Sequence, residues 1–275
     1  MNRQQIMQSF RDKVEAGRPI IGGGAGVGIS AKCAEAAGLD FLVIYNSGRY
    51  RMAGRSSMAG LMPYGDANQI VWEMATETLT VVNSVPVVAG VCGTDPFRVI
   101  PYFVRQLKEL GCAGVQNYPT VCLFDGIIRA NLEETGLGFD KEVDLIRTAR
   151  EQDLLTVAYV HDEDEARAMA QAGADAVVAH AGLTTSGTIG AKTALSLDEA
   201  IEFVGRIRDA ARSVHPAGFV FAHGGPIATP EDAGRVLSEV SGIHGFLGAS
   251  SMERLPTEVA MTDHMRTFVS LRLGG

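Results

Sequence analysis

Short apolar runs recur along the chain at regular intervals and predict buried strands. Four of these runs follow a polar, helix-like segment that ends in glycine, and they are Phe41–Ile44, Ala113–Val115, Ala176–Val178 and Gly245–Leu247. The glycines before them lie 73, 62 and 69 residues apart, at Gly38, Gly111, Gly173 and Gly242. Glycine adopts the left-handed conformation at a helix end without strain, so each phrase predicts a helix followed by a buried parallel strand.

Four further apolar runs complete a set of eight, at Pro19–Ile21, Pro86–Val88, Leu154–Val157 and Gly218–Phe221. The segments between the runs carry apolar residues at helical spacing, and they are Ile29–Ala37, Asn68–Val82, Phe97–Leu110, Asp140–Gln152, Glu163–Ala172, Leu197–Ser213 and Thr229–Val240. The first 17 residues form an amphipathic helical pattern on Ile6, Phe10 and Val14. Eight strand–helix units predict an α/β fold, a single TIM (β/α)8 barrel domain over residues 1–275. An open doubly wound sheet would show the same alternation of strands and helices. The fourfold recurrence of a helical segment, a glycine and an apolar run favours a closed barrel.

Composition and charge narrow the class of protein. The apolar fraction of 46% and the charged fraction of 20% are those of an ordinary globular protein. A net charge of −8, with Lys and Arg scattered along the chain, argues against nucleic acid as a partner. No apolar stretch approaches the roughly 20 residues of a membrane span, and the N-terminal segment lacks the apolar core of a signal peptide. We therefore expect a cytoplasmic protein that does not bind membranes.

Glycine-rich turns follow three of the predicted strands, on the side where TIM barrels hold their ligands. The first, Gly22–Gly28, permits close backbone approach, and we assign Gly23 and Gly24 to substrate binding. A dinucleotide fingerprint is disfavoured because no acidic residue follows at a second strand end. The turns after the last two strands predict a phosphate site made by backbone N–H groups, at Gly224, Gly225, Gly248, Ala249 and Ser250. The alternative is that these glycines only form tight turns.

The segment after the second strand is unusually long and runs from Asn46 to Asp66. Arg49 and Arg51 could clamp a carboxylate or phosphate, and Asn46 could position it. A solvated or subunit-contact loop is the alternative. Its Met-rich, partly apolar character favours self-association into a homo-oligomer, although these residues could also pack on the rim of their own barrel.

Three of the six histidines follow consecutive strands, at His161, His180 and His223. We assign them as catalytic acids or bases, with metal ligation as the alternative. After the third and fourth strands come Cys92, Asp95 and Asn117, of which Asp95 joins the catalytic set and the other two the substrate-binding set. Magnesium would need converging carboxylates, and Asp95 is the acidic residue placed at an early strand end, so the metal is left unassigned.

Five segments together resemble the phosphoenolpyruvate hydrolase-like family, also described as TIM-barrel signal-transduction proteins. They are Pro19–Ser30, Tyr45–Arg55, Val91–Pro96, Gly114–Thr120 and Ala222–Pro226. Similar barrels form the C-terminal part of plant tobamovirus-resistance proteins, joined there to an ATP-binding-like domain. The resemblance implies hydrolysis of a phosphoenolpyruvate- or phosphonopyruvate-like acid. The segment Ala89–Asp95 departs from the related mutase and lyase superfamily, because it lacks the paired aspartates that hold magnesium there.

Two functions follow from the sequence. The first is an enzyme that binds a small anionic metabolite, a phospho- or phosphono-carboxylic acid, at the C-terminal mouth of the barrel. The second is a non-catalytic barrel that senses such a metabolite and signals to a partner protein or ATP-binding-like domain.

Overall fold

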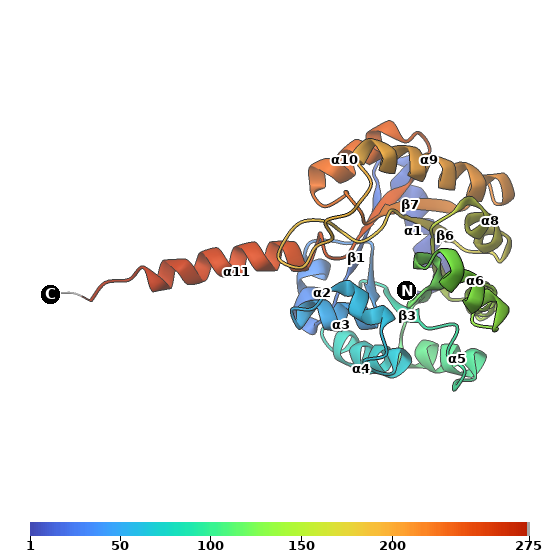
Figure 1. The fold of residues 1–275 in the computed structure, drawn as a ribbon, viewed down its shortest axis with the longest axis horizontal. Coiled ribbons are helices and arrows are strands. Elements are labelled where there is room, and N and C mark those ends of the chain that lie inside the picture. The colour runs from blue at the N-terminus through green and yellow to red at the C-terminus, as the bar shows by residue number, and fades with distance from the viewer. Residues whose placement is uncertain (274–275) are drawn as a thin grey trace.

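The predicted pattern of a helix, a glycine and a buried strand forms the repeating unit of the structure. Gly38, Gly111, Gly173 and Gly242 all have positive φ angles, between 77° and 119°. Each ends a helix just before a strand, as expected for a residue without a Cβ atom. The computed structural model describes residues 1–273, and within them eight parallel strands form a closed barrel (Figure 1).

The strands close into a barrel in sequence order, which confirms the predicted TIM barrel. The last strand pairs with the first through Ile20 opposite Gly245 and Gly22 opposite Leu247, so the sheet has no open edge and the doubly wound alternative was wrong. The strands are β1 (Ile20–Gly24), β2 (Phe41–Ile44), β3 (Val87–Val91), β4 (Gly114–Asn117), β5 (Leu155–Val160), β6 (Ala176–His180), β7 (Phe219–His223) and β8 (Gly245–Gly248).

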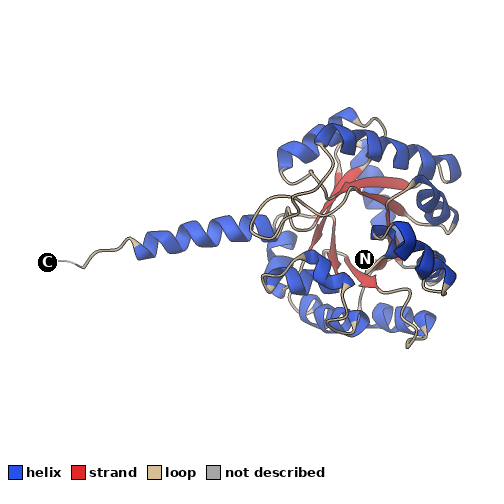
Figure 2. Ribbon diagram, viewed as in Figure 1, coloured by secondary structure: helices blue, strands red, loops and turns tan. Residues whose placement is uncertain are grey.

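The helices lie outside this barrel (Figure 2). Those that the sequence predicted are α1 (Arg3–Glu15), α2 (Gly28–Ala36), α4 (Ala67–Leu79), α5 (Ile100–Leu110), α7 (Asp140–Glu151), α8 (Glu163–Gln171), α9 (Leu197–Val214) and α10 (Pro230–Glu239). The sequence pattern did not reveal α3 (Asn46–Met52), α6 (Gly126–Glu134), α11 (Arg254–Val269) and the short 3₁₀ helices η1 (Ser57–Leu61) and η2 (Val121–Leu123). The segment after β2, expected to be a loop, is therefore largely helical.

The helix α1 closes the N-terminal end of the barrel. Phe10 packs against Phe41 and Phe219, the first residues of β2 and β7, with ring centroids 5.8 and 5.7 Å apart. Because this end is filled with aromatic rings, a ligand has access to the interior from the opposite end, where the strands finish.

The last helix, α11, leaves the barrel instead of packing on it (Figure 1). Its apolar side chains are largely exposed, including Val259 at 61%, Met265 at 56% and Phe268 at 62%. None of the helices within residues 1–273 has both the length and the apolar character needed to cross a membrane.

Candidate functional site

Five ring-bearing side chains line a narrow cavity on the barrel axis, which we call the axial cavity. Tyr45, Tyr118 and Tyr159 come from β2, β4 and β5 or the residues directly after them, and His180 and His223 end β6 and β7. The ring centroids of the two histidines are 4.6 Å apart, and each lies 4.8 Å from that of Tyr159. Polar groups complete the lining, contributed by Ser47, Arg51, Ser57, Thr184 and Ser250. One guanidinium among many hydroxyls suits a small oxyanion.

The two histidines carry opposite hydrogen-bonding roles. Nδ1 of His223 lies 2.6 Å from the carbonyl oxygen of Leu247, which can only accept, so Nδ1 is the protonated nitrogen. Its Nε2 then accepts a hydrogen bond from the Tyr159 hydroxyl at 3.3 Å. Nδ1 of His180 instead accepts from the N–H of Gly182 at 3.2 Å, which leaves its Nε2 protonated in the neutral ring. The cavity thus contains one imidazole acceptor and one imidazole donor.

Burial keeps both rings neutral near physiological pH. It lowers the pKa of His223 to about 4, and it lowers the pKa of His180 well below its ordinary value, with the neighbouring His223 adding to the effect. Burial also raises the pKa of the Tyr159 hydroxyl well above its ordinary value. The tyrosine therefore remains a hydrogen-bond donor beside His223.

Arg51 is the buried cation of the axial cavity, and the rest of the molecule holds it in place. It is 2% exposed, and its Nε and Nη2 donate to Glu253 Oε2 at 2.9 and 2.6 Å. The other oxygen of Glu253 accepts from the N–H of Gly26 at 2.6 Å. A Cβ atom on Gly24 would lie 3.3 Å from Arg51 Nη2, so this glycine makes room for the guanidinium. The glycine-rich turn after β1 therefore approaches an internal ion pair.

The two glycine turns predicted to bind phosphate differ in their placement. Ala249 and Ser250 line the axial cavity. The N–H of Gly225 instead donates to the carbonyl of Gly182 at 2.7 Å, and both Gly224 and Gly225 have positive φ angles, at 73° and 57°. These two residues thus join the turn after β7 to the loop after β6.

The remaining glycines named from the sequence serve packing. A Cβ atom on Gly23 would lie 2.3 Å from Leu39, and one on Gly248 would lie 2.6 Å from Met252. Both contacts are closer than a Cβ atom tolerates, so a side chain at either position would displace a neighbour.

Three of the predicted substrate-binding side chains already have protein partners. Asn46 donates to the carbonyl of Gly60 at 2.9 Å and accepts from the N–H of Ser47. Asn117 bonds to both the N–H and the carbonyl of Tyr159 and to Glu142 on α7, so it faces away from the axis. Arg49 lies on the surface, 3.5 Å from Glu77. The structure therefore places Asn117 and Arg49 outside the axial cavity and Asn46 in its surrounding wall.

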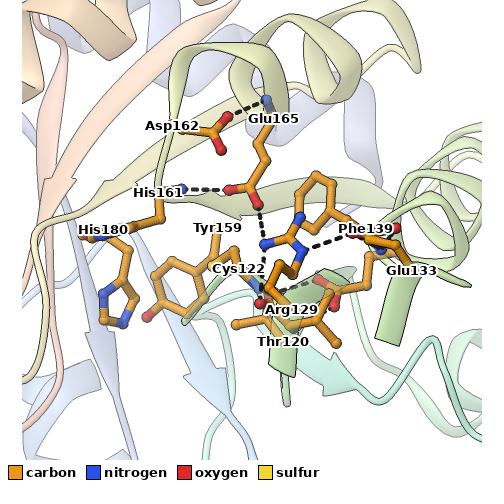
Figure 3. Close-up of polar contacts among 12 residues, drawn as sticks. Thr120, Cys122, Arg129, Glu133, Phe139, Tyr159, His161, Asp162, Glu165 and His180 are labelled. Atoms are coloured by element: carbon orange, nitrogen blue, oxygen red, sulfur yellow. Dashed lines mark hydrogen bonds and ion pairs between the residues drawn. The ribbon is translucent and has the colours of Figure 1, made fainter. Parts of the chain in front are cut away.

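His161 is also outside the axial cavity and belongs to a polar network behind it (Figure 3). Its ring Nδ1 donates to the carbonyl of His180 at 2.8 Å, and its backbone N–H donates to the carboxylate of Glu165 at 2.7 Å. Glu165 in turn pairs with Arg129 of α6 at 2.8 Å. His161 therefore supports the backbone that presents His180, while its own ring is exposed and packs on Phe203.

The residues after β3 do not form a magnesium site. Asp95 accepts from the side chain of Asn68 and the N–H of Phe97, both at 2.9 Å, and its Oδ2 lies 3.1 Å from Arg98 Nε. Across residues 1–273, no three His, Cys, Asp or Glu side chains are grouped so that they could hold a metal ion. Cys92 lies nearby as a mostly buried thiol, 3.5 Å from the Thr94 hydroxyl. The carboxylate of Asp95 thus stabilises its own loop.

Three site residues escaped the sequence reasoning: Tyr45, Tyr159 and Glu253. Strand alternation was the signal for Tyr159, because it points to the same side as Val157, two residues before it in β5. Glu253 gave no local signal, since it follows β8 by several residues and its partner Arg51 is 202 positions away.

Comparisons with known proteins agree with this architecture. The chain is 57% identical over 268 residues to the tomato (Solanum lycopersicum) ToMV susceptible protein tm-1(GCR26), covering 98% of this chain and 36% of that protein. Solved structures of similar fold include a phosphonopyruvate hydrolase complex with oxalate and Mg²⁺, at a TM-score of 0.62 and 17% identity, covering 99% of this chain and 89% of that one. Phosphoenolpyruvate phosphomutase from Streptomyces platensis subsp. rosaceus also has a TM-score of 0.62, at 18% identity, with 96% and 87% covered.

The chain spans about a third of the tomato protein's length, so it corresponds to one part of that relative. At such low identity the two solved structures show a shared fold and no more. The family model described as phosphoenolpyruvate hydrolase-like matches residues 5–271, which is nearly the whole chain. With this match, the closed barrel and the five resembling segments all in agreement, the chain belongs to the phosphoenolpyruvate hydrolase-like family.

Proposed function

We propose that the chain is an enzyme that acts on a small phospho- or phosphono-carboxylic acid in the axial cavity. The observation that carries the proposal is the pair of buried, neutral histidines with opposite proton roles beside a buried arginine. General base catalysis needs a group that accepts a proton, and a neighbouring N–H within reach of the same substrate can stabilise the charge that develops on the departing group. The named activity of the structurally similar phosphonopyruvate hydrolase supports this class of substrate.

Each residue has a defined role in this proposal. Arg51 and the hydroxyl of Ser250 bind the acid groups of the substrate. Nε2 of His223 accepts a proton from water. Without substrate, this nitrogen accepts a hydrogen bond from the Tyr159 hydroxyl instead. Water forms the new bond to phosphorus as the bond from phosphorus to the departing group breaks, and the departing group takes the proton that His223 removed from water. His180 stays neutral, and its Nε2–H donates a hydrogen bond to the charge that develops on the departing group.

The size of the axial cavity adds a conformational step to the proposal. Its volume is about 30 Å³, which is room for only about two water molecules. A three-carbon acid is larger, so the segment Gly182–Thr184 or the residue Ser57 must move outward for it to bind. Both belong to segments that cover the C-terminal ends of the strands, where TIM barrels accommodate such motion.

Turnover of phosphonopyruvate and phosphoenolpyruvate by the purified chain tests this function directly. Phosphorus NMR would follow release of phosphate, with enzymatic detection of pyruvate as a second readout. We expect His180→Gln and His223→Gln to lower kcat by about 100-fold or more. His215→Gln, at the C-terminal end of α9 and outside the cavity lining, is the control and should retain full activity. Full turnover by both cavity variants would contradict the assigned roles.

A non-catalytic sensing barrel is the second candidate function. Its support is that Asp95 is engaged within its own loop and that the chain matches only 36% of the tomato protein. On this proposal the barrel binds a small anion and passes its state to a partner protein, such as an ATP-binding-like domain. A thermal shift with phosphonopyruvate but no product, together with capture of a purified ATP-binding-like domain, would favour the sensor. Product formation by the chain alone would favour the enzyme.

A further inference from the structure

A second cavity, separate from the axial one, lies between the loops after β2, β3 and β4 and the helix α6. Its volume is about 650 Å³, within the range of sites that hold small organic ligands. Most of its wall is carbon, contributed by residues that include Leu61, Pro96, Val121, Phe124, Ile128 and Leu132. We call it the side cavity. Its size and apolar lining make it suited to a ligand quite unlike the anion of the axial cavity.

A hydrogen-bonded wall separates the two cavities. The hydroxyl of Ser47 donates to the carbonyl of Ser57 at 2.6 Å and lies 2.6 Å from the hydroxyl of Tyr118. On the other side, Asn46 is tied to the carbonyl of Gly60. Ser47, Ser57 and Tyr118 face the axial cavity, whereas Asn46 and Gly60 face the side cavity. The acid–base chemistry proposed above therefore makes no use of the side cavity.

The helix α6 presents Ile128 and Leu132 to the side cavity, and Leu132 also packs against the core. All of its residues remain partly or fully exposed, and Ile128 is 60% exposed. Polar contacts hold the helix, since Arg129 donates to the carbonyl of Val121 at 3.1 Å and pairs with Glu133 and Glu165 (Figure 3). Most helices are stabilised by packing an apolar face, and an apolar occupant would supply that packing to α6.

The polar end of the side cavity is acidic. Asp66 and Asp95 both line it, and Arg98 lies between them at 2.6 and 3.1 Å. Two carboxylates beside one guanidinium leave a formal charge of −1. Such an end repels a carboxylate and accepts an amine or hydroxyl donor.

We propose that the side cavity binds a small apolar molecule that ends in an amine or hydroxyl group. The apolar body lies against Phe124, Ile128 and Leu132, and the donor end points to Asp66 and Asp95. This ligand is neutral or positively charged, whereas the acid proposed for the axial cavity is negatively charged. Its binding can be measured without any turnover.

Straight-chain amines are the probes for this site, and isothermal titration of the full chain gives their Kd. If the alkyl chain is buried, each added methylene should tighten Kd about fourfold, so octylamine should bind about 15-fold more tightly than hexylamine. Octanoate has the same chain with the opposite charge and should bind about tenfold more weakly than octylamine. Binding that is equal for the two head groups, or independent of chain length, would overturn the proposal.

Two neighbouring residues on α6 provide a matched pair of variants. Ile128 lines the side cavity, whereas Ile127 is 78% exposed and is not part of its lining. We expect Ile128→Ser to weaken octylamine binding about fivefold. Ile127→Ser should leave Kd unchanged, and circular dichroism would confirm that both variants fold. Equal effects of the two substitutions on the Kd of octylamine would show that the amine binds outside the side cavity. This result does not depend on the outcome of the phosphonopyruvate assay.

Discussion

Glu142 shows how a single buried group sets the pH dependence of stability. It accepts hydrogen bonds from Asn117, Thr120 and the N–H of Val121, each at 2.7 Å, and burial raises its pKa from 4.5 to about 8. Between these values the unfolded chain loses a proton that the folded chain retains. The folded state then binds more protons, so the free energy of unfolding falls as pH rises through this interval.

We therefore expect Glu142→Gln to flatten the stability profile between about pH 5 and about pH 8, where the native protein should lose on the order of 1 kcal/mol per pH unit from this group. Urea unfolding of both proteins across that range is the measurement. Profiles that run parallel would show that Glu142 is already ionised in the folded protein.

His223 makes a separate prediction about catalysis. The base must be neutral to accept a proton, and burial lowers its pKa to about 4. For the proposed reaction, kcat/KM should be level through neutral pH and should fall only as the solution is acidified toward pH 4. An acid limb near pH 6.5, the ordinary value for an exposed imidazole, would instead indicate a solvent-exposed base.

At the scale of elements, the packing of the turn after β1 against α3 determines where Arg51 lies. A Cβ atom on Gly26 would lie only 2.2 Å from the carbonyl oxygen of Gly48, so the two segments could not approach as they do. We expect Gly26→Ala to destabilise the protein by about 1–3 kcal/mol. Gly205→Ala is the control, because Gly205 lies inside α9 with open space around it, and it should stabilise by about 0.5–1 kcal/mol. Chemical denaturation distinguishes the two, and equal shifts would contradict the close contact.

The sequence predicted elements well where burial and periodicity coincide. The strands and the helix α7 begin within one or two residues of their predicted starts, because their apolar residues face the core. The helix α3 was missed because the residues it buries are Asn46, Ser47, Gly48 and Arg51, which carry no apolar period. The helix α6 was missed for the related reason that it buries little.

The site was harder to predict than the fold because side-chain direction depends on strand phase. Position at a strand end correctly brought His180 and His223 together, and they pair directly across β6 and β7. Asn117 falls on the outward phase of β4, and the adjoining inward position is Tyr118, so counting alternate residues would have been the better guide there. His161 lies just beyond the end of β5, where strand alternation no longer fixes the direction of the side chain.

At the scale of the whole molecule, α11 departs from the usual plan of a barrel. In this fold each strand is followed by a helix of the outer ring, yet α11 projects away with Val259 and Phe268 exposed. Exposed apolar side chains of this kind favour burial against a second copy, in line with the homo-oligomer expected from the sequence. We predict a dimer by size exclusion with light scattering, and a shift toward monomer in Phe268→Ser. Tyr102→Ser, on α5, removes an equally exposed ring and should leave the mass unchanged.

Glu253 connects α11 to the buried Arg51 and to the turn after β1. It immediately precedes α11, and its two oxygens hold Arg51 and the turn after β1. We predict that a partner that reorients α11 also shifts the anchor of the buried guanidinium, which would link the proposed association to the proposed acid binding. Such coupling is reciprocal: by whatever factor pairing of the chains strengthens acid binding, the acid strengthens pairing by the same factor.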